Sequence, residues 1–133
     1  MMKSLTLILA LTLSVMFSST SFVGWTKVAE SVLGDTFYVD FERIRKHGGY
    51  VYYWRLSDLL KPNKHGTLSD KSYYQGDCKL FRQKELSASF HTEPMGKGTP
   101  SFSNKPKKEW SYPPPNGVAE VMLNRVCAYT RYK

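Results

Sequence analysis

The sequence has few of the residues on which most catalytic and metal sites depend. Its 133 residues include two cysteines and three histidines. His47, His65 and His91 are scattered, and none lies at helical spacing from a cysteine, whereas a metal site needs several ligands arranged together. The sequence also lacks the serine-hydrolase elbow, the zinc-protease pattern, the phosphate-binding glycine loop and the EF-hand spacing. We therefore predict a protein that is not an enzyme and has no metal or cofactor.

Acidic residues are also scarce, with 11 Asp and Glu against 19 Lys and Arg, a formal net charge of +8. Such an excess favours anionic partners, although it also serves simply to keep a small domain soluble. Asp40, Asp58 and Asp77 could meet as a catalytic acid pair, but carboxylates of this kind more often cap turns or pair with a nearby Arg or Lys. We favour the second interpretation for all three.

No apolar run is long enough to cross a bilayer, which takes about 20 residues. The run from Leu5 to Phe17 follows Lys3 and precedes the small residues Ser18 to Ser21. This order is typical of a secretory signal peptide, with a permanent anchor as the alternative. We expect residues 1–21 to be removed, which lowers the formal charge to +7 and leaves one domain, residues 22–133, periplasmic or secreted and without a transmembrane span. No cysteine follows the run to accept a lipid.

The sequence pattern of residues 22–133 predicts an α+β fold, in which a twisted antiparallel sheet is covered by one C-terminal helix. Residues 35–41 and 50–59 alternate between apolar and polar, and the second stretch places Tyr50, Tyr52, Trp54 and Leu56 on one face. These two strands should pair as antiparallel neighbours. Further extended stretches cover residues 25–32, 67–78 and 80–92, with a short strand around residues 100–103. Alternation also places Tyr73 and Tyr74 on opposite faces, so at most one of them should be core.

The helix follows the prolines Pro113 to Pro115, with Asn116 as the expected N-cap. An apolar stripe at helical spacing should pack this helix on the sheet; it consists of Ala119, Met122, Leu123, Val126 and Cys127.

The two cysteines, Cys78 and Cys127, are expected to form a disulfide because an exported domain matures in an oxidising compartment. The bond would close a loop of about 50 residues, which the chain-entropy model values at about 4 kcal/mol. A nucleophilic Cys78 and a metal-binding cysteine are the alternatives, and both lack neighbouring support in the sequence.

Several short motifs follow one another along the chain, namely Trp25, "FYVD" (37–40), "WRLSD" (54–58), "SDKSYYQGDC" (69–78), "MGKG" (95–98), Trp110 and "NRVC" (124–127). Their order, from about Trp25 to Cys127, resembles the surface-adhesin protein E-like domain of bacterial envelope proteins. The resemblance implies a bacterial, exported protein with a disulfide between sheet and helix. It also implies an adhesin-like binding module.

One segment combines lysines with aromatic residues and is the candidate ligand-binding site, with a solvated loop as the alternative. Its residues are Lys97, Lys105, Lys107, Lys108, Phe102 and Trp110. Extracellular or envelope proteins and anionic glycans are the expected partners. An exported location argues against single-stranded nucleic acid, although tyrosines among basic residues can stack on bases. The alternative function is a structural or assembly protein of the envelope that self-associates through a sheet edge.

Overall fold

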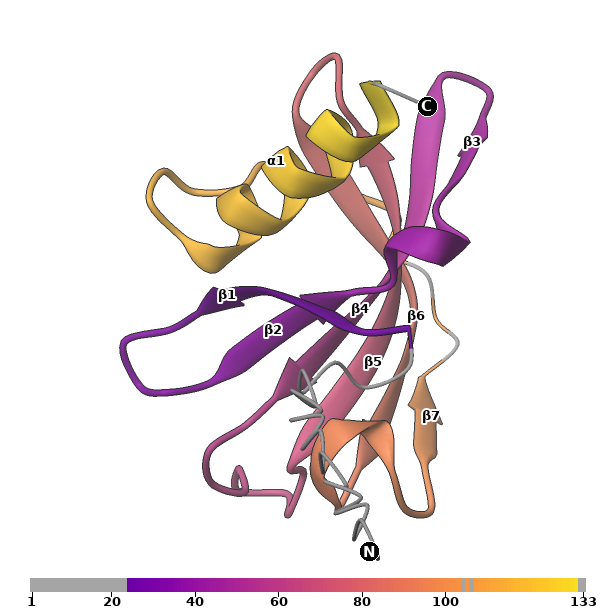
Figure 1. The fold of residues 1–133 in the computed structure, drawn as a ribbon. Coiled ribbons are helices and arrows are strands. Elements are labelled where there is room, and N and C mark those ends of the chain that lie inside the picture. The colour runs from indigo at the N-terminus through magenta and orange to yellow at the C-terminus, as the bar shows by residue number, and fades with distance from the viewer. Residues whose placement is uncertain (1–23, 104, 106, 132–133) are drawn as a thin grey trace, which may run out of the picture.

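The structure, a computed structural model, describes residues 24–103, 105 and 107–131 (Figure 1). The predicted signal peptide lies outside these residues. The elements are β1 (Thr26–Glu30), β2 (Thr36–Val39), the short 3₁₀ helix η1 (Phe41–Arg43), β3 (Arg45–His47), β4 (Tyr50–Asp58), β5 (Ser69–Asp77), β6 (Arg82–His91), the 3₁₀ turn η2 (Pro94–Gly96), β7 (Ser101–Ser103) and α1 (Val118–Arg131).

The described strands form one antiparallel sheet in the order β1-β2-β4-β5-β6-β7. Strand β4 is long enough for two partners on the same edge. Its first residues, Tyr50–Tyr52, pair with β3 across the Gly48–Gly49 turn, and Arg55–Asp58 pair with β2. The predicted antiparallel pairing of the strands around residues 35–41 and 50–59 is thus confirmed, with β3 as an additional hairpin between them.

The hydrophobic core lies between α1 and one face of the sheet. Val39, Val51 and Tyr53 are buried on the sheet side, and the helix contributes Met122, Leu123, Val126 and Cys127. Gly76 makes this close packing feasible, because a Cβ there would lie 2.9 Å from Val51 Cγ2 and 3.2 Å from Leu123 Cδ1. Four residues of the predicted apolar stripe therefore pack on the sheet as expected, whereas the fifth, Ala119, is only half-buried.

The start of the helix differs from the prediction. Asn116 has φ of +62° and the helix begins at Val118, so Asn116 lies in the preceding turn and is not the N-cap. The turn is closed by the Gly117 amide, which donates to the Pro114 carbonyl (3.4 Å). Asn is among the few residues other than glycine that adopt this left-handed conformation readily.

A disulfide between Cys78 and Cys127 joins the end of β5 to α1, with the two Cα atoms 5.7 Å apart. Together with the sheet and helix, this bond confirms the predicted fold class. None of the helices in the described part of the chain has the length and apolar character needed to cross a membrane.

The two ends of the sheet path are short or irregular. Strand β7 has three residues, and β1 has an irregularity between Lys27 and Ala29 and carries the Lys27–Glu30 ion pair (2.9 Å). Bulges, charges and short length all make an edge a poor template for a second chain. Self-association stays a prediction.

Candidate functional site

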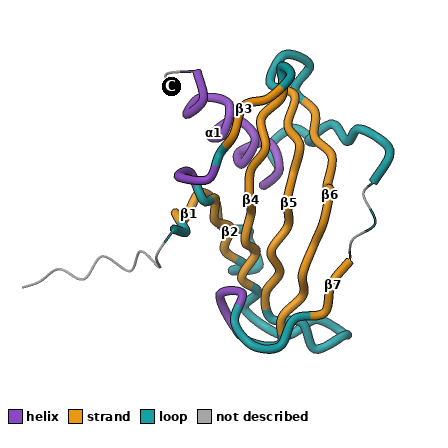
Figure 2. Tube along the Cα trace, turned by 90° about the vertical axis from the view of Figure 1, so that its right-hand side faces the viewer, coloured by secondary structure: helices purple, strands orange, loops and turns teal. Residues whose placement is uncertain are grey.

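The face of the sheet opposite α1 carries a row of aromatic side chains, which we call the aromatic face: Tyr50, Tyr52, Trp54, Tyr73 and Trp110. In Figure 2, α1 does not cross β4, β5 and β6 on this side. The short η2 turn packs here, against Leu56 and Lys71 at one end of the face. Tyr73 lies between its neighbours, with ring centroids 4.8 Å from Trp54 and 6.2 Å from Tyr52. At the end of the face formed by the start of β4, the ring centroid of Trp110 lies 5.4 Å from that of Tyr50. These side chains are half-buried, so each ring keeps part of its surface in solvent.

Alternation along β5 places the two tyrosines as predicted, on opposite faces. Tyr74 stacks on the buried Tyr53 with ring centroids 5.7 Å apart and packs against the core. Tyr73 belongs to the aromatic face. Burial raises the pKa of Tyr53 and of Tyr74, and the Tyr53 hydroxyl donates to Gln83 Oε1 (3.0 Å). The phenols on the core side are therefore neutral structural groups at physiological pH.

Two cations cover the indole of Trp110. The Arg82 guanidinium carbon lies 4.2 Å and the Lys84 Nζ 4.4 Å from the ring centroid, both at cation–π distance. The three side chains meet because Arg82 and Lys84 are two residues apart on β6 and share a face, while Ser111 pairs with Gln83 and brings Trp110 to that strand. Alternation along Arg82–Lys84 does place the two cations on one face of the strand, but we did not predict them as site residues.

At the other end of the aromatic face is a pocket of about 390 Å³ whose lining includes Trp25, Asp40, Trp54, Lys71 and Phe102. Successive cross-strand pairs build it, since Lys71 on β5 pairs with Ser89 on β6, which pairs with Phe102 on β7. Asp40 follows β2, and its amide donates to the carbonyl of Trp54 on β4 (3.3 Å). Sequence reasoning missed this pocket because its residues come from separate strands with no shared motif.

The "MGKG" motif forms the turn that holds Lys71. The Met95 amide donates to Asp58 Oδ1 and the Gly96 amide donates to Ser69 Oγ, both at 2.8 Å. These bonds seat the turn against β4 and β5. A Cβ on Gly96 would lie 3.0 Å from Lys71 Cδ, so the glycine lets the backbone approach the aliphatic part of that side chain.

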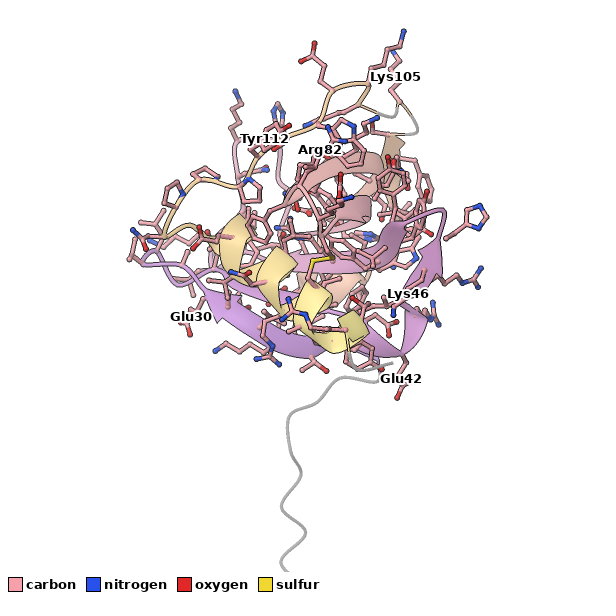
Figure 3. All side chains as sticks on the ribbon, turned by 90° about the horizontal axis from the view of Figure 1, so that it is seen from above. Glu30, Glu42, Lys46, Arg82, Lys105 and Tyr112 are labelled. Carbon is pink, nitrogen blue, oxygen red and sulfur yellow. A yellow bond between two sulfur atoms is a disulfide. The ribbon has the colours of Figure 1, made fainter. Side chains whose placement is uncertain are left out.

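The six predicted ligand-binding residues belong to residues 97–110, which run beside β6 through β7 and the Gln83–Ser111 bridge. We call this region the β6 edge, and within it the six residues do not form one cluster. Phe102, on β7, is 69% exposed and lines the pocket, whereas Trp110 lies near the start of β6. Lys107 is held at the strand by an ion pair with Glu85 (Nζ to Oε2, 3.4 Å). Lys97, Lys105 and Lys108 are exposed. In Figure 3, Lys105, Arg82 and Tyr112 lie on one side of the molecule, and Glu30 and Glu42 lie on the opposite side.

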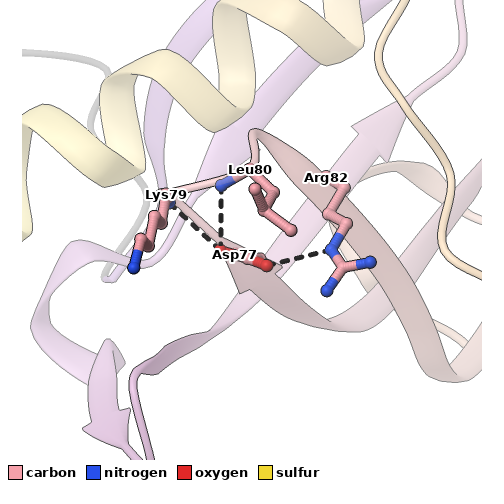
Figure 4. Close-up of polar contacts among 4 residues, drawn as sticks. All are labelled: Asp77, Lys79, Leu80 and Arg82. Atoms are coloured by element: carbon pink, nitrogen blue, oxygen red, sulfur yellow. Dashed lines mark hydrogen bonds and ion pairs between the residues drawn. The ribbon is translucent and has the colours of Figure 1, made fainter.

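The three aspartates have separate structural contacts and do not form an acid pair. Asp58 accepts from the Met95 amide, and Asp40 pairs with Arg43 (3.3 Å). Asp77 closes the β5–β6 turn, accepting from the Lys79 and Leu80 amides at 3.1 Å and from Arg82 Nε at 2.9 Å (Figure 4). Within the described residues, no three His, Cys, Asp or Glu side chains are grouped so as to hold a metal ion.

Asp77 also has a shifted pKa. Burial alone would raise it, but the hydrogen bonds from Leu80, Arg82 and Lys79 outweigh that effect and lower the pKa below its ordinary value. The carboxylate is therefore ionised throughout the physiological range.

In a comparison with known families, residues 25–128 match the surface-adhesin protein E family. Comparison with curated protein sequences gives no match. Among solved structures, crystal form II of Haemophilus influenzae protein E is 19% identical, with a TM-score of 0.63 over 81% of this chain and 90% of that one. Protein E from non-typeable Haemophilus influenzae is 18% identical, with a TM-score of 0.60 over 83% and 79% of the two chains. At this identity the structural likeness concerns the fold alone.

Proposed function

Since the chain belongs to the surface-adhesin protein E family, we propose that it is an exported, non-catalytic binding module of the bacterial envelope. Its ligands are acidic or matrix-type molecules, bound through basic and aromatic residues along the β6 edge. Residues 1–21 act as the signal peptide, and residues 22–133 form the single domain, which resides in the periplasm or outside the cell.

The observation that carries this proposal is the cluster of Trp110, Arg82 and Lys84. The exposed Lys105 and Lys108 belong to the chain segment that leads to Trp110. Arg82 is also bonded to Asp77, so its guanidinium is held in place before a ligand arrives. A fixed cation beside an aromatic ring suits a ligand that presents sulfate or carboxylate groups on an apolar framework, because charge attraction and ring contact act together. The formal net charge, +8 for the whole chain and +7 without Lys3 of the signal peptide, adds long-range attraction for such a ligand.

Heparin, an anionic glycan, is a suitable probe for this surface. We expect the mature protein to bind immobilised heparin at low ionic strength and to elute as salt screens the contacts. The double variant Lys105→Ala/Lys108→Ala should bind about three- to tenfold more weakly, since each exposed charge contributes up to about 1 kcal/mol. The measurement is the heparin dissociation constant across a salt series.

Lys61→Ala/Lys64→Ala is the matched control. It removes the same charge from exposed positions in the loop between β4 and β5, away from the β6 edge. If both double variants weaken binding equally, the interaction depends on net charge and not on this surface. Failure of the unsubstituted protein to bind heparin at low salt contradicts the proposal directly.

A further inference from the structure

The pocket at the other end of the aromatic face has a different chemistry from the basic β6 edge. Its lining combines the aromatic residues Trp25, Trp54 and Phe102 with the cations Arg43 and Lys71. Asp40 and Glu42 supply two negative charges that balance the two cations. A ligand with a strong charge of either sign would meet like charge here, so the lining favours a neutral ligand that is both apolar and rich in hydrogen-bonding groups.

Asp40 provides a specific reason to expect a hydrogen-bond donor in that ligand. The residue is 5% exposed. Its Oδ2 pairs with Arg43 Nε at 3.3 Å, whereas Oδ1 is buried without a hydrogen-bond partner among the described residues. A buried acceptor without a donor costs free energy, and a ligand O–H or N–H that reaches the carboxylate recovers it.

The backbone beside Asp40 is shaped for close approach. Gly24 lines the pocket with φ of +86°, and a Cβ there would lie 3.3 Å from Asp40 Oδ2. A side chain at this position would crowd the carboxylate and strain the backbone. The aliphatic part of Lys71 packs against Gly96, where a Cβ would lie 3.0 Å from Lys71 Cδ. The backbone therefore lies close to both the acceptor and the donor at a glycine, where a larger residue would crowd them.

From these observations we propose that the pocket binds a neutral sugar unit of a glycan, a hexose or an N-acetylhexosamine. A sugar ring has an apolar C–H face that packs on an aromatic ring by dispersion and by the hydrophobic effect. Its hydroxyl groups can donate to Asp40 and accept from Lys71 at the same time. A volume of about 390 Å³ is within the range of small-ligand sites. The assignment does not depend on heparin binding, because it uses different charged residues.

The experiment is titration of the mature protein with methyl glycosides of galactose, glucose, mannose and N-acetylglucosamine, followed by saturation-transfer NMR and by tryptophan fluorescence. We expect at least one to bind with Kd of about 1 mM, typical of a ligand this small. Binding should be unchanged across a salt series, because the ligand has no charge. Phe102→Ala should weaken binding about tenfold by removing one aromatic wall, and the 69% exposure of Phe102 makes a folding defect unexpected.

Asp40→Asn keeps the size of the side chain but alters its acceptor, and it should weaken binding about ten- to a hundredfold. Trp110→Ala is the matched control, an aromatic residue of the same face outside the pocket, and should leave sugar affinity unchanged. Binding of none of the four glycosides overturns the proposal, as does binding that Phe102→Ala and Trp110→Ala weaken equally. Two sets of charged probes test the neutral assignment: sulfated or sialylated sugars, which are anionic, and the amides of lysine and arginine, which are cationic. If only one of these sets binds in the pocket, the neutral assignment is wrong. Heparin binding is tested by a different variant, Lys105→Ala/Lys108→Ala, on the other surface. Failure of the heparin proposal and failure of the sugar proposal can therefore be told apart.

Discussion

At the scale of single residues, Asp77 links a turn to the aromatic face. Its Oδ1 accepts from two amides of the β5–β6 turn, in which Phe81 has a left-handed φ of +52°, and its Oδ2 accepts from Arg82. Arg82 in turn covers Trp110. One carboxylate thus supports both the turn that follows Cys78 and the cation of the proposed binding surface.

Asp77→Asn should lower the free energy of unfolding at pH 7 by about 1–3 kcal/mol, because the hydrogen bonds to a buried charged acceptor are weakened. The lowered pKa gives the sign of the pH dependence. The stabilisation is fully present above the ordinary aspartate pKa of about 3.9 and is lost as the pH falls through the lower folded value. Urea unfolding between pH 7 and pH 3 should therefore show the variant and the parent converging toward low pH.

Asp70→Asn is the control, because burial raises the pKa of Asp70. Its charge opposes folding at neutral pH, so its removal should not reproduce the loss seen with Asp77→Asn. A constant difference between Asp77→Asn and the parent at every pH would contradict the assigned role.

At the scale of elements, the helix depends on both packing and a covalent bond. Helix α1 buries Met122, Leu123 and Val126 against the sheet, and a 14-residue helix is marginal in isolation. The disulfide joins α1 to the end of β5 across a sequence separation of 49 residues. Restricting such a long loop in the unfolded chain adds to the stability that side-chain packing provides.

Reduction of the bond should lower the free energy of unfolding by about 4 kcal/mol, the chain-entropy value for a loop of this length. Urea unfolding with and without reductant measures the difference. Cys78→Ser/Cys127→Ser serves as the control, because the chain has no other cysteine and the variant must not respond to reductant. An unchanged midpoint on reduction of the parent would show that packing alone sets the position of the helix.

At the scale of the whole molecule, the sheet separates the hydrophobic core from the surfaces that we propose bind ligands. One face carries the core, α1 and the disulfide, and the other carries the aromatic row, the pocket and the cations over Trp110. Both faces are built from the same strands, because successive side chains of a strand point alternately to the core and to the aromatic face.

We therefore expect Cys78→Ser/Cys127→Ser to retain its heparin affinity within about twofold at temperatures where it stays folded, since ΔΔG values at distant sites are independent. Circular dichroism establishes the folded fraction, and the heparin dissociation constant is then measured on that sample. A large loss of affinity in the folded variant would show that the tether positions the binding residues.

The amino-acid sequence by itself determined the elements whose signal is local. Alternation placed Tyr50, Tyr52, Trp54 and Leu56 on one face, and helical spacing picked out Met122, Leu123 and Val126 as buried residues. The wider pattern of motifs identified the family. These properties follow from periods of 2 and 3.6 residues, which need no knowledge of distant contacts.

The tertiary structure alone decided which face α1 covers and which residues meet on the other. Alternation divides a strand into two faces but does not say which is buried, and here the helix covers Val51 and Tyr53 and leaves Trp54 to the opposite side. Trp25, Asp40, Lys71 and Phe102 come together through strand register, over separations of up to 77 positions in the sequence. Even the role of Asn116 depended on the turn between the prolines and the helix, where it has φ of +62°. Such contacts arise from the packing of whole strands, so no local pattern records them.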